Sequence, residues 1–414
     1  MNTWELKVVR KIVLLKAGFF LLLLFSTDRC SALLTASTLS LPEVAIVSIY
    51  RKADLALVQE KYLLEFKKGK NILEFGLTEN IDKDSLLLRI LENEDKVKIE
   101  ERKFLPASNK IIWEVSATDS LRTGLEVVYF IGGISWNAIY YLDAREKDSL
   151  SLSCFVEVEN KSGRDFPLAK IRLISGQPHL LREEKREFLK SLAQTWYQEK
   201  ITPEIAPTIE EKPVAEYHVY DFKEKISLKE GKKYSLALFT AEDIPCEILY
   251  RFNFRKEGNF PSLVYRFKNL LSFPFPEGTI MGWFVREEGK DYLGRNTLPY
   301  TPAGEEVEIS LGKENRLKME RKLSSFLRNG LEFSFRGIIV KYEQEEEYTL
   351  SLRNFFEKKV RIKIVEEIPG EWVLVTSSIP AVRKQAEVLE FDTLLLPAET
   401  KNIIYKIKRT VRVK

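Results

Sequence analysis

LSLSCFVEVE, residues 150–159, alternates apolar and polar side chains with a period of two residues. The same alternation recurs at 246–254, 306–311, 360–364 and 405–408, and turns rich in Gly and Pro separate the runs. Such a pattern is typical of antiparallel strands that have one buried and one solvated face. We therefore expect an all-β protein built from two or three β-sandwich, immunoglobulin-like units in tandem.

One segment departs from this pattern and has the spacing of a helix. Apolar residues between 181 and 196 recur every three or four positions among charged residues, which predicts one inserted amphipathic helix. A Pro-rich linker follows, so that the insertion covers 180–213. Phe188, Leu192 and Trp196 form one apolar ridge, which would either bind a partner or pack as a cap on a sandwich.

The order of these patterns divides the chain into four parts. Residues 1–32 are expected to be a signal peptide and 41–108 an N-terminal β-unit. A central sandwich with the helix and linker insertion would cover 109–312, and a C-terminal sandwich would cover 313–414. Within the last part, an ambiguous pattern at 314–325 suggests one more short helix.

The first 32 residues have the layout of a secretory signal. A basic segment from Lys7 to Lys16 precedes nine apolar residues at 17–25, and the small-residue motif Cys30-Ser31-Ala32 follows. The alternative is an uncleaved membrane anchor, but nine apolar residues are too few to span about 30 Å of hydrocarbon. We therefore expect an exported protein of the periplasm or cell envelope.

Composition excludes several classes of function. The 414-residue chain has a formal net charge of +4, of which residues 1–32 carry +3, so the remaining chain is nearly neutral and nucleic acid is not an expected partner. Two His and three Cys cannot supply a zinc cluster or an iron–sulfur site, and no Gly-rich phosphate loop is present. We expect no metal and no cofactor.

Two cysteines remain after the predicted signal. Cys154 and Cys246 both belong to apolar faces of expected strands. An exported protein can join such a pair in a disulfide. The alternative is two buried free thiols, which are common for cysteine.

No residue pattern indicates catalysis. Ser135 stands in GISWN, where Asn137 replaces the second Gly of a nucleophile elbow, and His179 and His218 are isolated. The runs of glutamate at 345–347 and 366–367 suggest solvated strand ends and turns. We therefore expect no catalytic residues.

The last predicted strand is strongly basic. Its basic residues are Lys401, Lys406, Lys408, Arg409, Arg412 and Lys414. Lysine on an edge strand protects against aggregation, which is the favoured interpretation. The alternative is attraction to anionic lipid or polysaccharide.

Three longer motifs resemble one family. IYRKADLALV at 49–58, GGISWNAIYYL at 132–142 and VENKSGRDF at 158–166 resemble the mucoidy-inhibitor-like family of exported bacterial proteins, whose main domain is a domain of unknown function. The resemblance implies an exported, all-β envelope protein with no assigned catalytic residues. Longer members carry a coiled coil, for which this chain has no room between 104 and 111. Structural roles are implied for Gly133, Ser135, Trp136, Asn160, Gly163, Gly278 and Gly312.

The leading functional hypothesis is a non-catalytic binding or scaffolding module, whose partner is a protein or a cell-surface polymer of the envelope. One alternative is a hydrolase that acts on envelope polysaccharide, which would need two facing carboxylates. Another is a peripheral membrane-surface protein that uses the basic C-terminal strand, although the leading hypothesis does not require membrane contact. The sequence does not indicate the oligomeric state.

Overall fold

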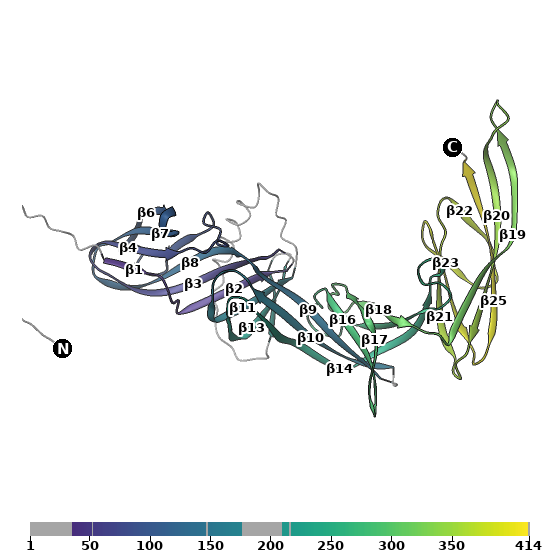
Figure 1. The fold of residues 1–414 in the computed structure, drawn as a ribbon, viewed down its shortest axis with the longest axis horizontal. Coiled ribbons are helices and arrows are strands. Elements are labelled where there is room, and N and C mark those ends of the chain that lie inside the picture. Colours follow the sequence, from purple (N-terminus) through teal and green to yellow (C-terminus); the bar gives the residue numbers. More distant parts are fainter. Residues whose placement is uncertain (1–34, 52, 146–147, 176–208, 215–216, 413–414) are drawn as a thin grey trace, which may run out of the picture.

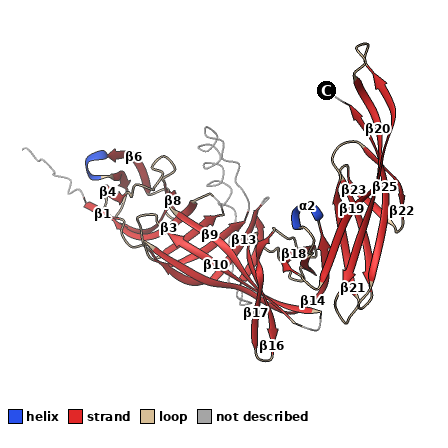
Figure 2. Ribbon diagram, turned by 45° about the vertical axis from the view of Figure 1, so that its right-hand side comes forward, coloured by secondary structure: helices blue, strands red, loops and turns tan. Residues whose placement is uncertain are grey.

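The computed structural model describes residues 35–51, 53–145, 148–175, 209–214 and 217–412. Strands account for 72% of the structure and helices for 2%, which confirms the predicted all-β sandwich fold (Figure 2). The described helical turns are η1 (Pro106–Ser108) and α2 (Phe254–Glu257). Within the described ranges, no helix is long and apolar enough to cross a membrane. The predicted helix and its ridge of Phe188, Leu192 and Trp196 lie outside the described residues.

Two sheets enclose the N-terminal core. The smaller sheet has four strands in the order β1 (Thr35–Thr38), β4 (Gly69–Gly76), β7 (Lys110–Ala117) and β6 (Val97–Leu105). The larger has seven strands in the order β12 (Ile209–Val214), β13 (Tyr217–Leu228), β11 (Phe166–Ser175), β2 (Val44–Tyr50), β3 (Leu55–Phe66), β8 (Leu121–Gly132) and β5 (Leu87–Ile90). Aromatic rings of Phe75 and Tyr129 meet between the sheets at 5.4 Å.

A ten-stranded sheet continues the molecule. Its path is β17 (Gly289–Leu298), β16 (Gly278–Arg286), β9 (Ile134–Ala144), β10 (Ser149–Asn160), β14 (Lys232–Phe252), β21 (Val360–Glu367), β24 (Val388–Leu395) and β23 (Ala381–Gln385). β15 (Ser262–Lys268) branches from β14 and pairs with β18 (Glu306–Lys313). Trp136 on β9 donates to the carbonyl of Ile49 on β2 at 3.0 Å and so connects this sheet with the seven-stranded one.

The C-terminal sheet has four strands in the order β19 (Leu317–Phe333), β20 (Ile339–Asn354), β25 (Thr400–Arg412) and β22 (Trp372–Ser377). It packs on the β21–β24–β23 end of the ten-stranded sheet, where the rings of Phe391 and Tyr405 lie 5.3 Å apart. Together these strands enclose a second core. Figure 1 shows an elongated molecule in which this C-terminal sandwich rises at an angle from one end.

Strand pairing crosses two of the expected domain boundaries. The boundary at 108/109 falls inside the β6–β7 hairpin, which η1 closes, and β8 pairs with β3 along its whole length. The linker expected to extend to 213 already forms strand β12 from Ile209. The short helix expected at 314–325 is wrong, because β19 runs through this segment and pairs with β20.

The cysteine pair is not joined. Cys154 and Cys246 are both buried free thiols, so the disulfide interpretation is wrong and its alternative holds. Cys154 lies opposite Phe239 in the β10–β14 ladder, and Cys246 is seven residues farther along β14. At about 3.3 Å per residue this separation is roughly 20 Å, whereas a disulfide requires Cα atoms within about 7 Å.

The basic C-terminal strand is not an edge strand, so that interpretation is also wrong. β25 lies between β20 and β22, and its Lys406 and Lys408 lie opposite glutamates of β20. Lys408 pairs with Glu343 at 2.7 Å and Lys406 with Glu347 at 3.7 Å. The neighbouring strand, rather than solvent, therefore compensates much of this charge.

The free thiols lead to a first prediction. Burial raises the pKa of Cys246 to about 11 and that of Cys154 further, so both stay protonated and unreactive at neutral pH. In a Cys30→Ser background, a thiol-specific reagent should label neither residue in the native protein and both in denaturant. A reducing agent should leave the thermal midpoint unchanged, and a drop of several degrees on reduction would contradict the free-thiol assignment.

Candidate binding site in the C-terminal sandwich

Two of the motif residues, Asn160 and Gly163, belong to one turn, residues 160–164, which we call the junction turn. Asn160 is buried, and its amide donates to the carbonyls of Arg164 at 2.8 Å and Leu228 at 3.1 Å. Its side-chain oxygen accepts from the backbone and hydroxyl of Ser162. Gly163 has φ +78° and donates its N–H to Glu230. Asn160 thus replaces the strand hydrogen bonds that the turn interrupts.

The junction turn sends one cation into the N-terminal sandwich. Arg164 follows Gly163, and its Nη2 donates to both carboxylate oxygens of buried Glu60, each at 3.0 Å. Burial raises the pKa of Glu60, and the Arg164 charge opposes that shift. The guanidinium also lies 4.9 Å from the ring centroid of Phe75. The motif therefore ties two sheets together, which is a structural role.

The remaining motif residues lie at close backbone approaches. A Cβ on Gly278 would lie 2.4 Å from the carbonyl oxygen of Ala138, and one on Gly312 would lie 2.6 Å from that of Leu293. Trp136 is buried, and Ser135 pairs with Glu159 within the β9–β10 ladder. Ser135 therefore lies in regular sheet and not at a nucleophile elbow.

Of the two histidines, the structure describes His218. It is the second residue of β13 and lies beside Tyr300, with ring centroids 5.6 Å apart. His179 lies outside the described residues.

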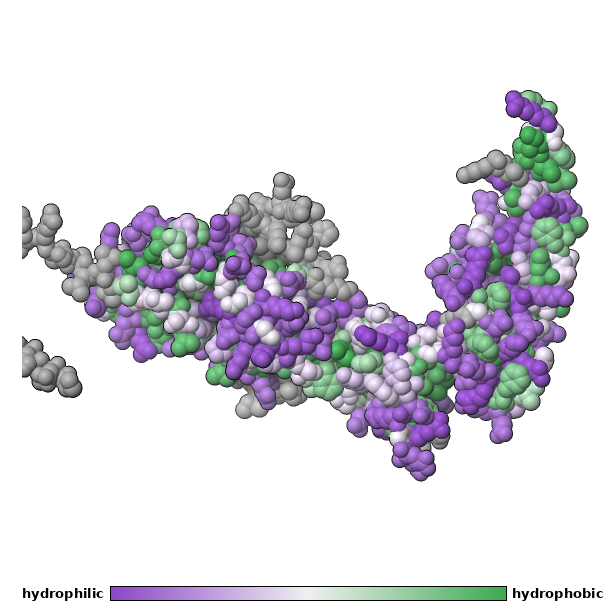
Figure 3. All heavy atoms as spheres, in the orientation of Figure 1, coloured by the Kyte–Doolittle hydropathy of each residue, from purple (hydrophilic) through white to green (hydrophobic). Residues whose placement is uncertain are grey.

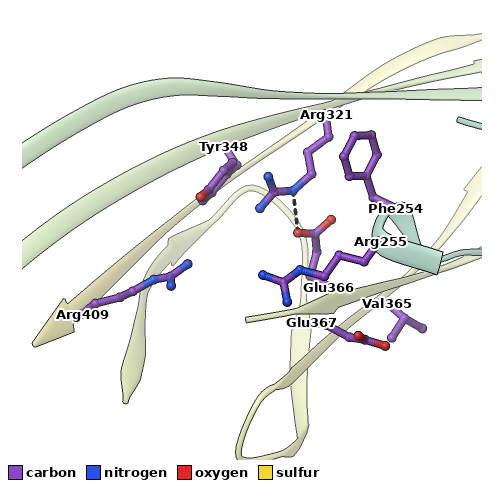
Figure 4. Close-up of a pocket in the computed structure, with 8 residues that line it drawn as sticks. All are labelled: Phe254, Arg255, Arg321, Tyr348, Val365, Glu366, Glu367 and Arg409. Atoms are coloured by element: carbon purple, nitrogen blue, oxygen red, sulfur yellow. Dashed lines mark hydrogen bonds and ion pairs between the residues drawn. The ribbon is translucent and has the colours of Figure 1, made fainter. Parts of the chain in front are cut away.

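A polar cavity lies elsewhere, in the C-terminal sandwich. It has a volume of about 180 Å³ and opens between α2 and the strands β19, β20, β21 and β25 (Figure 4). Its lining residues are Phe254, Arg255, Arg321, Tyr348, Val365, Glu366, Glu367 and Arg409. We call it the α2 pocket. Nothing in the sequence analysis identified it.

The single turn of α2 forms one wall of this pocket. Asn253 caps the turn by accepting from the N–H of Lys256 at 3.2 Å, and its amide donates to Glu367 at 2.9 Å. Lys256 also pairs with Glu367 at 2.7 Å. Hydrogen bonds from Lys256 and Asn253 lower the pKa of Glu367. β21 thereby holds the turn that presents Phe254 to the opening.

Three lining residues and one neighbour form what we call the four-charge cluster: Arg321, Glu346, Glu366 and Arg409. Arg321 donates to Glu366 at 2.8 Å, and Arg409 donates to Glu346 at 3.0 Å. Only 4% of the Glu366 side chain and 6% of the Glu346 side chain are exposed. The expectation that these glutamates are solvated is therefore wrong. Pairing offsets the large cost of burying each carboxylate.

Two tyrosines complete the cluster. Tyr405 donates to Glu366 at 2.7 Å and Tyr348 donates to Glu346 at 2.6 Å. The Arg321 guanidinium lies 3.8 Å from the centroid of the Tyr348 ring. Burial and the Glu366 charge together raise the pKa of Tyr405. Burial tends to lower the pKa of Arg321, but the Glu366 carboxylate outweighs that tendency and raises it. Arg321 therefore stays charged at neutral pH.

Two buried polar atoms of the cluster have no hydrogen-bond partner among the residues that the structure describes. They are Oε1 of Glu366, an acceptor, and Nε of Arg409, a donor. Buried polar atoms normally find partners, because an unpaired one costs free energy. Both residues line the α2 pocket, so a small molecule in it could accept from one and donate to the other. Across the described ranges, no group of three His, Cys, Asp or Glu is placed to hold a metal ion.

The alternation of the strands could have revealed this cluster. Ile362, Ile364 and Glu366 share one face of β21, and Tyr348, Leu350 and Leu352 continue the face of Glu346 on β20. Arg321 likewise continues the buried face of β19, and Arg409 that of β25. All four charged residues therefore occupy core positions at one end of the sandwich.

The junction turn leads to a second prediction. Gly133 (φ +78°) faces the turn, and a Cβ there would lie 2.4 Å from the carbonyl oxygen of Lys161. Gly231 (φ +68°) has the same backbone handedness but open space around it. Gly231→Ala should cost about 1–2 kcal/mol of unfolding free energy through backbone strain alone. Gly133→Ala should cost clearly more in urea unfolding, and equal losses would contradict the packing role.

The cluster leads to a third prediction. Arg321→Met leaves Glu366 buried without its cation and should cost about 3 kcal/mol of unfolding free energy. The double variant Arg321→Met/Glu366→Met removes both charges and should be more stable than the single variant. Urea unfolding of the two variants checks this order, and a double variant less stable than Arg321→Met would show that the ion pair is not the dominant interaction.

Comparison with known proteins bears on residues 125–410. No curated protein matches the chain. The family described as Domain of unknown function (DUF4139) matches residues 125–410, which include GGISWNAIYYL, VENKSGRDF and the α2 pocket. The match confirms the expected domain of unknown function, whereas the narrower mucoidy-inhibitor-like resemblance stays a prediction. The chain belongs to the DUF4139 family.

Proposed function

We propose that this protein is an exported, non-catalytic binding protein of the cell envelope, and that the α2 pocket binds one sugar unit of a cell-surface polymer. The observation that carries the proposal is the pair of atoms without a described partner, Glu366 Oε1 and Arg409 Nε, on two residues that line a pocket bordered by an aromatic ring. The signal-like segment 1–32 and the mucoidy-inhibitor-like motifs support the envelope location.

The chemistry of the pocket suits a sugar. A sugar hydroxyl can donate to Glu366 and another oxygen can accept from Arg409, while the apolar face of a ring can lie on Phe254. The volume of about 180 Å³ corresponds to roughly six water molecules. One ring fits this volume, so a polymer would be held through a single unit or a chain end. Three arginines against two glutamates in the lining favour an acidic sugar.

Hydrolysis is the second candidate, because Glu346 and Glu366 bring two carboxylates to one cluster. A glycosidase needs one of its two carboxyl groups protonated as general acid. Each of these glutamates instead accepts hydrogen bonds from an arginine and from a tyrosine hydroxyl. This arrangement favours binding over hydrolysis. The helix face of Phe188, Leu192 and Trp196 stays a predicted second surface for a protein partner.

Sugar binding leads to a fourth prediction. Titration with oligogalacturonate, with N-acetylglucosamine oligomers as the neutral probe, should give saturable binding to the full chain by calorimetry. Phe254→Ala should weaken binding at least about tenfold, since loss of a stacking ring typically costs on the order of 1–2 kcal/mol. Phe260→Ala is the matched control, because Phe260 is 37% exposed, Phe254 is 36% exposed, and Phe260 does not line the pocket.

The outcomes separate the candidates. Binding that Phe254→Ala and Phe260→Ala weaken equally would refute the α2 pocket as the site. New reducing ends that accumulate with wild-type protein but not with Glu366→Gln would favour the hydrolase instead.

A further inference from the structure

The β19–β20 hairpin extends beyond the sheet that supports it. β20 pairs with β25 as far as Lys341, which lies opposite Arg412. Past this point, β19 and β20 pair only with each other among the described residues, and a turn between Ser334 and Ile338 closes them. Figure 1 shows this end projecting away from the rest of the sandwich. We call residues 326–340 the hairpin tip, of which 333–340 lie past the last β20–β25 pair.

The hairpin tip is apolar although it is exposed. Figure 3 shows hydrophobic side chains gathered near its end. The exposed fractions are 93% for Phe335, 61% for Ile338, 58% for Phe333, 52% for Leu327, 46% for Phe326, 45% for Leu331 and 39% for Val340. Soluble proteins rarely expose so many large apolar side chains together without a binding role.

Apolar residues occupy both faces of this ribbon. Successive strand residues point to opposite faces, so Phe326 and Leu327 lie on different sides, and both are about half exposed. Ile339 and Val340 are likewise successive residues of β20, and Ile339 lies opposite Phe333. A flat protein surface would cover one face and leave the other in water. A medium that surrounds the tip would cover both.

Basic residues border the apolar ones. Arg328 and Arg336 lie in the tip and Arg412 at its base, whereas Lys341 pairs at 2.6 Å with Glu332, the acidic residue between 326 and 341. The guanidinium of Arg336 lies 5.2 Å from the ring centroid of Phe335, and that of Arg328 lies 5.3 Å from that of Phe326. Arginines whose stems follow aromatic rings can keep their charge at an interface while the rings are buried. This combination is complementary to an anionic surface with an apolar interior.

We infer that the hairpin tip inserts into the interfacial region of a lipid membrane that contains anionic lipids. Phe333, Phe335 and Ile338 would enter the boundary between headgroups and acyl chains, and the arginines would contact lipid phosphates. Insertion is shallow, because the outer edge of β19 carries backbone groups that hydrocarbon cannot hydrogen-bond. A second copy of the chain is less suitable, since two basic tips would repel each other.

Membrane insertion of the tip does not depend on sugar binding, but one strand, β20, connects the tip with the α2 pocket. Tyr348 of the α2 pocket lies nine residues along β20 from Ile339. At about 3.3 Å per residue, this length of strand is roughly 30 Å. The rigid hairpin would therefore hold the pocket away from the membrane that its tip contacts.

Vesicle flotation tests the inference with the full chain. Wild-type protein should float with phosphatidylcholine vesicles that contain a quarter phosphatidylglycerol, and much less with phosphatidylcholine alone. Phe335→Ser/Ile338→Ser should reduce the bound fraction at least about tenfold without changing the thermal midpoint, because both residues are exposed. Leu394→Ser/Leu396→Ser is the matched control, because these leucines are 56% and 59% exposed on the same sandwich but outside the tip.

A second measurement identifies which part of the protein contacts the lipid. An environment-sensitive dye on a Phe335→Cys variant should shift to the blue with anionic vesicles, and the same dye on Leu394→Cys should not. Binding should also weaken as salt is added, because exposed charges are screened. No flotation of the wild type, or equal flotation of the tip variant, would overturn the inference. Concentration-dependent dimers that only the tip variant abolishes, without vesicle binding, would identify a second copy as the occupant and also overturn it.

Discussion

One uninterrupted strand, β14, connects the two larger of the three hydrophobic cores in the described part of the molecule. Its first part pairs with β10 and contributes Leu238 and Ile244 to the larger core, and its last part pairs with β15 and β21 and contributes Tyr250 and Phe252 to the smaller one. Because backbone hydrogen bonds continue along the strand, the joint between the cores is a sheet and not a flexible linker. β14 ends at Phe252, next to Asn253, so the same strand also places α2 over its pocket.

The alternation of apolar residues was sufficient to predict the fold class, because a period of two depends only on local sequence. It could not predict which strands are neighbours. β25 carries several basic residues, as many edge strands do. The glutamates of β20 that neutralise it lie more than fifty residues earlier in the sequence. The segment 314–325 looked helical in isolation, and only its pairing with β20 makes it a strand. The assignment of both segments thus depends on contacts that are distant in sequence.

The candidate site is not predicted from the sequence for a different reason, although the alternation that indicates it is present there. Runs of glutamate are usually solvated, which favours a surface position. The two-residue alternation of the strands instead places Glu346 and Glu366 on core faces. Once Arg321 and Arg409 are included, acids and bases occupy core positions of four strands at the same end of the sandwich. Their spatial coincidence could not be read from the sequence, because it requires the strand registers.

The four-charge cluster also marks where the sandwich core stops along β19 and β20. Toward one side of it, Met319, Leu350 and Leu352 are fully buried between two sheets. Toward the other, the hairpin loses its facing sheet, and a strand needed only for stability would become polar or end. The chain instead continues with Phe326, Leu327, Phe333 and Phe335 in exposed positions. Exposed aromatic residues at the end of a hairpin contribute little to the stability of the free protein. Their presence is therefore explained better by an apolar partner at the tip than by the requirements of folding.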